Sequence, residues 1–162
     1  LQDPGAYLLH ERVGDEASTA ALEAAGLAGY EDRDPRRLSG GERQRLALAI
    51  VLDGDEPPAV VCLDEPTRGM DRADKAALAG RIAGLADAGT AVLVATHDPE
   101  FAARACDRVV LLADGRVIAD GSAADVLGGG WYFATEVARV TNGAALLPED
   151  GAALVTTAEV PA

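Results

Sequence analysis

Residues 59–65 read Ala59-Val60-Val61-Cys62-Leu63-Asp64-Glu65, a short apolar run that ends in two carboxylates. The run follows Pro57-Pro58 and is rich in β-branched residues, which is typical of a strand buried on both faces of a parallel sheet. Open α/β sheets bind ligands beyond the carboxyl ends of their strands. The stretch therefore predicts an α/β fold and places Asp64 and Glu65 at the edge where a ligand would bind.

The two carboxylates suit magnesium and water chemistry. Mg²⁺ keeps most of its waters and takes few protein oxygens, so one carboxylate can orient the hydrated ion. The adjacent carboxylate can polarise an attacking water as a general base. Taken alone, the same pair at a strand end has a simpler interpretation, in which it only keeps that end solvated.

A second strand is predicted at 91–95, directly before Thr96 and His97. Strands and helices alternate through residues 59–112, which indicates a βαβ arrangement with parallel strands. His97 then lies at the same sheet edge as Glu65. A lone histidine is more often a surface or hydrogen-bonded residue, but at this edge we expect contact with a terminal phosphate or an attacking water.

A helix start is predicted at Leu38-Ser39-Gly40-Gly41-Glu42. Ser39 and Glu42 have the spacing of a capping box, in which each side chain satisfies a backbone donor. Gly40 and Gly41 leave the neighbouring amides open to an anion, and the helix dipole favours negative charge there. A capping box alone is usually structural. The two glycines, followed by a strand that ends in Asp-Glu, favour an anion-binding role.

The remaining segments predict more helices and one hairpin. Helices are expected over 17–29, from Glu42, from about Arg72 to near Gly89, after a cap at Asp98, and from Ser122 to Leu127. Residues 109–112 and 116–118 flank a turn at Asp114-Gly115, which predicts an antiparallel hairpin. In the tail, 135–140 predicts a short helix, and the tail either docks on its own domain or contacts another subunit.

The composition narrows the possible classes of protein. Asp and Glu total 27 against 14 Lys and Arg, a net charge of −13, which disfavours a nucleic-acid-binding surface. No apolar run approaches the ~20 residues needed to cross a bilayer, so we expect membrane association only through a partner. Cys62, expected to be buried in its strand, and Cys106 lack metal-ligand spacing, which indicates a reducing compartment.

Five motifs in one order resemble the ATPase domain of ATP-binding cassette (ABC) proteins. The stretch 38–42 resembles the family signature, and 60–65 resembles its Walker B strand. Pro66-Thr67-Arg68-Gly69-Met70-Asp71 is similar to its D-loop region. His97 resembles its switch histidine, and Gln2, in Leu1-Gln2-Asp3-Pro4, resembles its Q-loop glutamine. The likeness runs from residue 1 to about residue 127.

The resemblance implies an α/β, P-loop NTPase-like fold with a partial parallel sheet flanked by helices, a small helical subdomain and a C-terminal hairpin. It implies three parts. Residues 1–37 would hold the Q-loop and the helical subdomain. Residues 38–127 would be the ATPase core from signature to switch histidine, and 128–162 a glycine joint with the tail.

The resemblance also implies ATP and Mg²⁺ as cofactors, shared by a head-to-tail pair of such domains. In that arrangement the signature acts in trans, and it would contact the nucleotide held by the other domain. The implied nucleotide contacts there are Ser39, Gly40, Gly41 and Glu42.

Other roles implied by the resemblance concern the domain's own nucleotide. Glu65 would be the base for water, and His97 would be catalytic beside it. Asp64, through water, and Gln2 would support Mg²⁺ and contact ATP. Asp71 would link the two sites across the dimer, and Gln2 would also sense the membrane partner.

No G-x-x-x-x-G-K-[ST] phosphate loop occurs in the 162 residues. The family has that loop before its Q-loop, and this sequence opens at the Q-loop. The sequence is therefore interpreted as a C-terminal fragment of a longer ATPase, which alone binds ATP weakly if at all and does not hydrolyse it.

The leading function is the ATP-binding and ATP-hydrolysing subunit, or half of a fused one, of an ABC transporter. Its expected partners are a second ABC ATPase domain, in a homo- or heterodimer, and a transmembrane subunit, with no nucleic acid. It would be cytoplasmic and peripheral on the inner face of the membrane. Residues 3–9 and 133–139 resemble the energy-coupling-factor branch of cobalt and vitamin importers.

Two other functions stay open. The first is a soluble ABC-type ATPase of DNA repair, chromosomes or ribosomes, which shares the signature and the Asp-Glu pair. The second is a non-enzymatic, degenerate cassette that only completes a partner's site. The presence of both Glu65 and His97 argues against the second.

Overall fold

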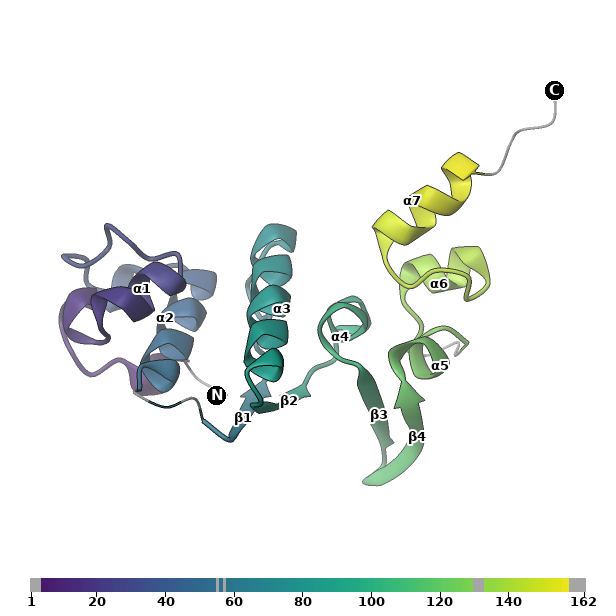
Figure 1. Ribbon diagram of the computed structural model, residues 1–162, viewed down its shortest axis with the longest axis horizontal. Coiled ribbons are helices and arrows are strands. Elements are labelled where there is room, and N and C mark those ends of the chain that lie inside the picture. The colour runs from purple at the N-terminus through teal and green to yellow at the C-terminus, as the bar shows by residue number, and fades with distance from the viewer. Residues whose placement is uncertain (1–3, 55, 57, 130–132, 158–162) are drawn as a thin grey trace. The chain divides into compact units, whose positions relative to one another are not determined.

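The computed structural model describes residues 4–54, 56, 58–129 and 133–157 (Figure 1). The chain divides into two compact units, Leu1–Thr96 and His97–Ala162. Gln2, Trp131 and Tyr132 lie outside the described residues.

The first unit opens with a helical part. Its elements are the 3₁₀ turns η1 (Pro4–Tyr7), η2 (Val13–Asp15) and η3 (Pro35–Arg37) and the helices α1 (Thr19–Ala24) and α2 (Gly40–Leu52). Their apolar side chains form one buried cluster that includes Leu22, Leu27 and Leu46. The start of α1 is tied to the residue after α2, because the Ser18 hydroxyl and amide both donate to the carboxylate of Asp53, each at 2.6 Å. Both hydrogen bonds lower the pKa of the Asp53 carboxyl, and the one from the Ser18 hydroxyl has the larger effect.

The rest of the first unit is the predicted βαβ element, formed by β1 (Val60–Asp64), α3 (Arg72–Asp87) and β2 (Ala91–Ala95). β1 and β2 are parallel and pair from Val60 opposite Ala91 to Asp64 opposite Ala95. α3 packs against β2 (Figure 1). Past the end of α3, Gly89 has φ +93°, a left-handed conformation that glycine adopts without strain.

The prediction that the first strand is buried on both faces is wrong. Val61 and Leu63 are buried, but Val60 is 59% exposed and Cys62, expected inside, is exposed as well. On β2, Leu93 is 65% exposed. α3 packs against β2, and burial alternates along β1, so one face of this strand is covered in the structure and the other is exposed.

The second unit begins with α4 (Pro99–Ala105), followed by the strands β3 (Arg108–Ala113) and β4 (Arg116–Ser122) and by α5 (Ala123–Leu127). The predicted cap of α4 is confirmed, since Asp98 accepts from the Phe101 amide at 3.0 Å. β3 and β4 form the predicted antiparallel hairpin, with Asp114 and Gly115 at φ +50° and +72°. α5 ends at Leu127, as expected.

The tail contains two helices, α6 (Glu136–Thr141) and α7 (Pro148–Thr157). α6 matches the predicted helix, with Thr135 as its buried cap. α7 was not predicted, although Pro148 followed by two acidic residues is a typical helix start. An ion pair of 2.6 Å between Arg104 and Glu149 links α4 to α7 within the second unit. The predicted division at residues 37 and 127 stays a prediction.

Candidate functional site

The glycine-rich motif forms the first turn of α2, and its capping box is present. The Glu42 amide donates to the Ser39 hydroxyl at 3.2 Å, and the Ser39 amide donates to Glu42 Oε2 at 2.7 Å. The Ser39 amide is the main cause of the lowered pKa of the Glu42 carboxyl. Glu42 is therefore committed to the cap, and it stays ionised at a helix end where negative charge is favoured.

The two glycines of this turn have different surroundings. A Cβ added at Gly40 would find nothing closer than the Arg68 carbonyl oxygen, 4.0 Å away. A Cβ added at Gly41 would lie 3.0 Å from Asp74 Oδ2 of α3. Gly40 is thus open to an approaching ligand, whereas at Gly41 the space that a Cβ would need is largely taken by Asp74 of α3. This difference could not be read from the motif, because it depends on Asp74, thirty-three positions away in the sequence.

Replacement of Gly41 by Ala is expected to destabilise the protein by about 1–2 kcal/mol through overpacking against Asp74. The matched control is Gly40→Ala, whose Cβ meets no close atom. Thermal unfolding should show a midpoint several degrees lower for Gly41→Ala than for Gly40→Ala, by roughly 2–4 °C per kcal/mol. Equal midpoints would show that the two glycines are equivalent, against the contact with Asp74.

Asp71, in the segment similar to the D-loop, caps α3 in this structure. Its Oδ1 accepts from the Asp74 amide at 2.8 Å. The same segment lies beside the start of α2, since a Cβ at Gly69 would be 4.0 Å from Gly40 Cα. The structure therefore brings the signature-like turn and the segment around Asp71 together. The predicted role of Asp71 across a dimer stays a prediction.

Asp64 and Glu65 lie at the carboxyl end of β1, as expected, and both are half-buried. The Glu65 amide donates to the Ala95 carbonyl of β2 at 2.8 Å. Glu65 has φ +47°, which is uncommon for a residue with a Cβ and costs on the order of 1–2 kcal/mol. Strained residues of this kind cluster at functional sites, so the conformation is a second pointer to Glu65. No sequence pattern predicts it.

The carboxylates at this edge of the sheet are the type of oxygen ligand that Mg²⁺ prefers. Among the described residues, no group of three or more His, Cys, Asp and Glu side chains could enclose a metal ion. A carboxylate beside a strand end is nevertheless sufficient for a hydrated Mg²⁺, which keeps most of its waters. Asp64 is the residue of this chain that would orient the ion, and Gln2 lies outside the described residues.

His97 opens the second unit and is exposed. It directly precedes Asp98, the cap of α4, so the local sequence fixes its place at the start of that helix. Its predicted approach to Glu65, which belongs to the first unit, stays a prediction.

Comparison with known proteins gives one consistent result. A family profile described as ABC transporter matches residues 7–68. A putative ABC transporter ATP-binding protein of Streptomyces coelicolor is 44% identical over 152 residues, which cover 86% of this chain and 27% of that protein. Energy-coupling factor transporter ATP-binding protein EcfA2 of Methanospirillum hungatei is 40% identical over 112 residues, covering 69% of this chain and 28% of that protein.

Among solved structures, CbiO1 of Clostridium perfringens, described as part of the ABC transporter complex CbiONQ, matches with a TM-score of 0.67 and 26% identity. The match covers 95% of this chain and 65% of CbiO1, which confirms the predicted α/β fold class. The chain spans about a quarter of the length of the two curated relatives. In the part of the chain that the structure describes, no helix combines the length and apolar character needed to span a membrane.

Proposed function

Because the chain belongs to the ABC transporter family of ATP-binding proteins, we propose that it contributes one half of a shared ATP site, in a pair of such domains that drives transport. The observation that carries this proposal is the first turn of α2. Its capping box is intact, Gly40 is open to a ligand, and Gly41 leaves room for Asp74 of α3. Such a turn presents free backbone amides to an anion, which suits the terminal phosphate of a nucleotide held by a second domain.

The residues at the end of β1 would serve the nucleotide of their own domain. Mg²⁺, when bound with ATP, neutralises charge on the phosphates. Asp64 would orient that ion through water, together with Gln2. Glu65 would accept the proton of the attacking water, and His97 would hold the terminal phosphate or the water in place. These residues act by positioning and by charge, and no covalent intermediate is required.

The proposed partners are a second ABC ATPase domain and a transmembrane subunit. The likeness to EcfA2, an energy-coupling factor transporter ATP-binding protein, supports the energy-coupling-factor branch. The likeness to CbiO1, which is described as part of an ABC transporter complex, supports a role in transport. Residues near Gln2 and Tyr7 would contact the transmembrane subunit. In that assembly the chain would lie on the cytoplasmic face of the membrane.

The 162-residue chain by itself is expected to show no ATP turnover above background, because it contains no phosphate loop to hold its own nucleotide. The measurement is phosphate release with Mg²⁺ and ATP, compared with the full-length protein under the same conditions. Turnover by the isolated chain would contradict the assignment of its residues to a half-site.

The function itself is tested with the full-length protein. Mg²⁺-dependent turnover that rises when the transmembrane subunit is added in lipid would support transport coupling. No turnover with a competent partner would instead indicate a degenerate cassette. Turnover stimulated by DNA or ribosomes, and not by a membrane subunit, would indicate the soluble class of ATPase.

A further inference from the structure

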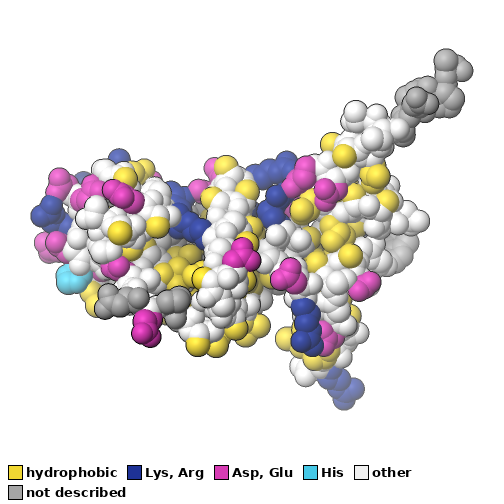
Figure 2. Space-filling model, viewed as in Figure 1, with side chains coloured by type: hydrophobic (Ala, Val, Ile, Leu, Met, Phe, Trp, Pro, Cys, Tyr) yellow, Lys and Arg dark blue, Asp and Glu magenta, His cyan; other side chains and the backbone are white. Residues whose placement is uncertain are grey.

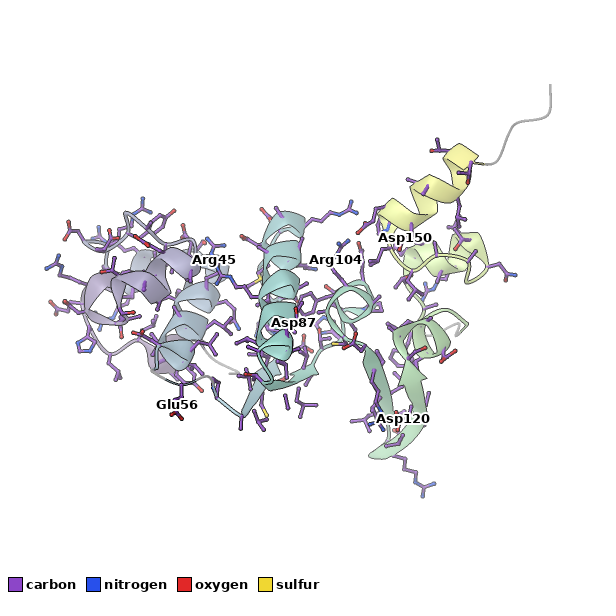
Figure 3. All side chains as sticks on the ribbon, viewed as in Figure 1. Arg45, Glu56, Asp87, Arg104, Asp120 and Asp150 are labelled. Carbon is purple, nitrogen blue, oxygen red and sulfur yellow. The ribbon has the colours of Figure 1, made fainter. Side chains whose placement is uncertain are left out.

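A small cavity lies between α2 and α3, behind the signature-like turn. Its polar lining comes from Gln44 and Arg45 of α2 and from Asp74 and Arg81 of α3, and part of its apolar lining from Leu48 and Leu78. Its volume is about 10 Å³, which is room for one small ion or one water molecule. Figure 3 shows Arg45 reaching from α2 towards α3.

Two donors at this cavity are buried and unsatisfied. Gln44 is 5% exposed, and its Nε2 has no hydrogen-bond partner. Nε of Arg45 is also buried and also has no hydrogen-bond partner. Buried donors without an acceptor are rare in folded proteins because each loses its hydration without compensation. Both atoms therefore point to an acceptor that is not part of the described chain.

The charges at the cavity do not balance. Arg45 forms an ion pair with Asp74, whose side chain is 34% exposed. Arg81 makes no ion pair with a carboxylate among the described residues. Burial lowers the pKa of the Arg81 guanidinium, and the charge of Arg45 adds to the shift. One positive charge is thus left partly buried without a counterion. Figure 2 shows basic side chains gathered between the helical part of the first unit and α3.

We propose that this cavity binds one small monovalent anion, with chloride as the physiological candidate, held by Gln44 Nε2, Arg45 Nε and the guanidinium of Arg81. A water molecule would accept the two hydrogen bonds but would leave the excess positive charge without a counterion. An anion would accept the hydrogen bonds and also neutralise that charge. The anion would also keep Arg45 and Arg81 from repelling each other, so that Arg45 stays on Asp74. Asp74 in turn lies beside Gly41, since a Cβ added there would be 3.0 Å from its Oδ2, so the ion would stabilise the packing next to the signature-like turn.

The test is thermal unfolding of the full-length protein in sodium chloride and in sodium gluconate at equal ionic strength. Salts also affect stability without specific binding, so the informative quantity is the chloride-minus-gluconate difference in Tm for each variant. We expect that difference to be larger by about 3 °C in the wild type than in Arg81→Met, because a bound ion stabilises only the folded state. Arg36→Met, at an exposed arginine away from the cavity, should behave like the wild type. A difference in Arg81→Met equal to that of the wild type would overturn the proposal.

Crystals of the wild-type protein grown in bromide give a second test that needs no variant. Anomalous diffraction should place one bromide beside Gln44 Nε2 and Arg45 Nε. Density for a water molecule there, without anomalous signal, would overturn the proposal, and so would an empty cavity.

Discussion

Replacement of Glu65 by Gln in the full-length protein is expected to lower kcat for ATP hydrolysis by about a thousandfold. A positioned general base contributes roughly 10²–10⁴-fold, and glutamine keeps the shape of the side chain but cannot accept the proton. ATP and Mg²⁺ should still bind, so a nucleotide-bound pair of domains should accumulate. Phosphate release and the amount of ATP retained after gel filtration measure the two effects.

The control for this experiment is Glu23→Gln, the same chemical change at an exposed position of α1. It should leave kcat and nucleotide retention unchanged. Turnover at the normal rate in Glu65→Gln would remove Glu65 as the base. The strained backbone at this residue would then need another explanation.

Replacement of Ser39 by Arg in the full-length protein is expected to abolish turnover while nucleotide binding by the same domain is retained. The change removes the cap of α2, puts a long cation at a helix start, and blocks the approach to Gly40. Loss of the cap alone costs about 1 kcal/mol, which does not account for complete inactivity. Ser39→Ala, which loses the cap but leaves space for phosphate, should retain part of the activity.

Mixed dimers separate action in trans from a local defect. In a pair of one wild-type and one Ser39→Arg domain, the altered turn faces the nucleotide held by the wild-type domain. That nucleotide should no longer be hydrolysed. Loss of binding at the domain that carries the substitution would contradict the proposed geometry.

The parts of the fold that the sequence predicted well are those set by a few neighbouring residues. Asp98 before Pro99 predicts a helix cap, and Asp114-Gly115 predicts a tight hairpin turn, because both preferences act within four residues. The parallel pairing of β1 with β2 was also predicted, since the helix between them leaves few other arrangements.

The features that the sequence did not predict depend on residues far apart in the chain. Whether Val60 and Cys62 are buried is decided by what covers their face of the sheet, and the strand's own residues carry no information on that. The need for glycine at position 41 arises from Asp74, and the neighbouring Gly40 has no such constraint. The sequence predicts the residue types and the order of a candidate site, which stays a prediction, whereas the surroundings of Gly41 and the backbone conformation of Glu65 required the structure.

The hydrogen bond from the Glu65 amide to the Ala95 carbonyl gives β2 a part in the proposed chemistry. Glu65 takes its unfavourable backbone angle at the end of a five-residue strand, and this bond to the neighbouring strand helps to hold it there. The direction of the Glu65 carboxylate therefore depends on how firmly β2 stays paired with β1. Residues of β2 that have no reactive group would in this way affect the rate of the proposed hydrolysis, because they decide how firmly the end of β1 is held.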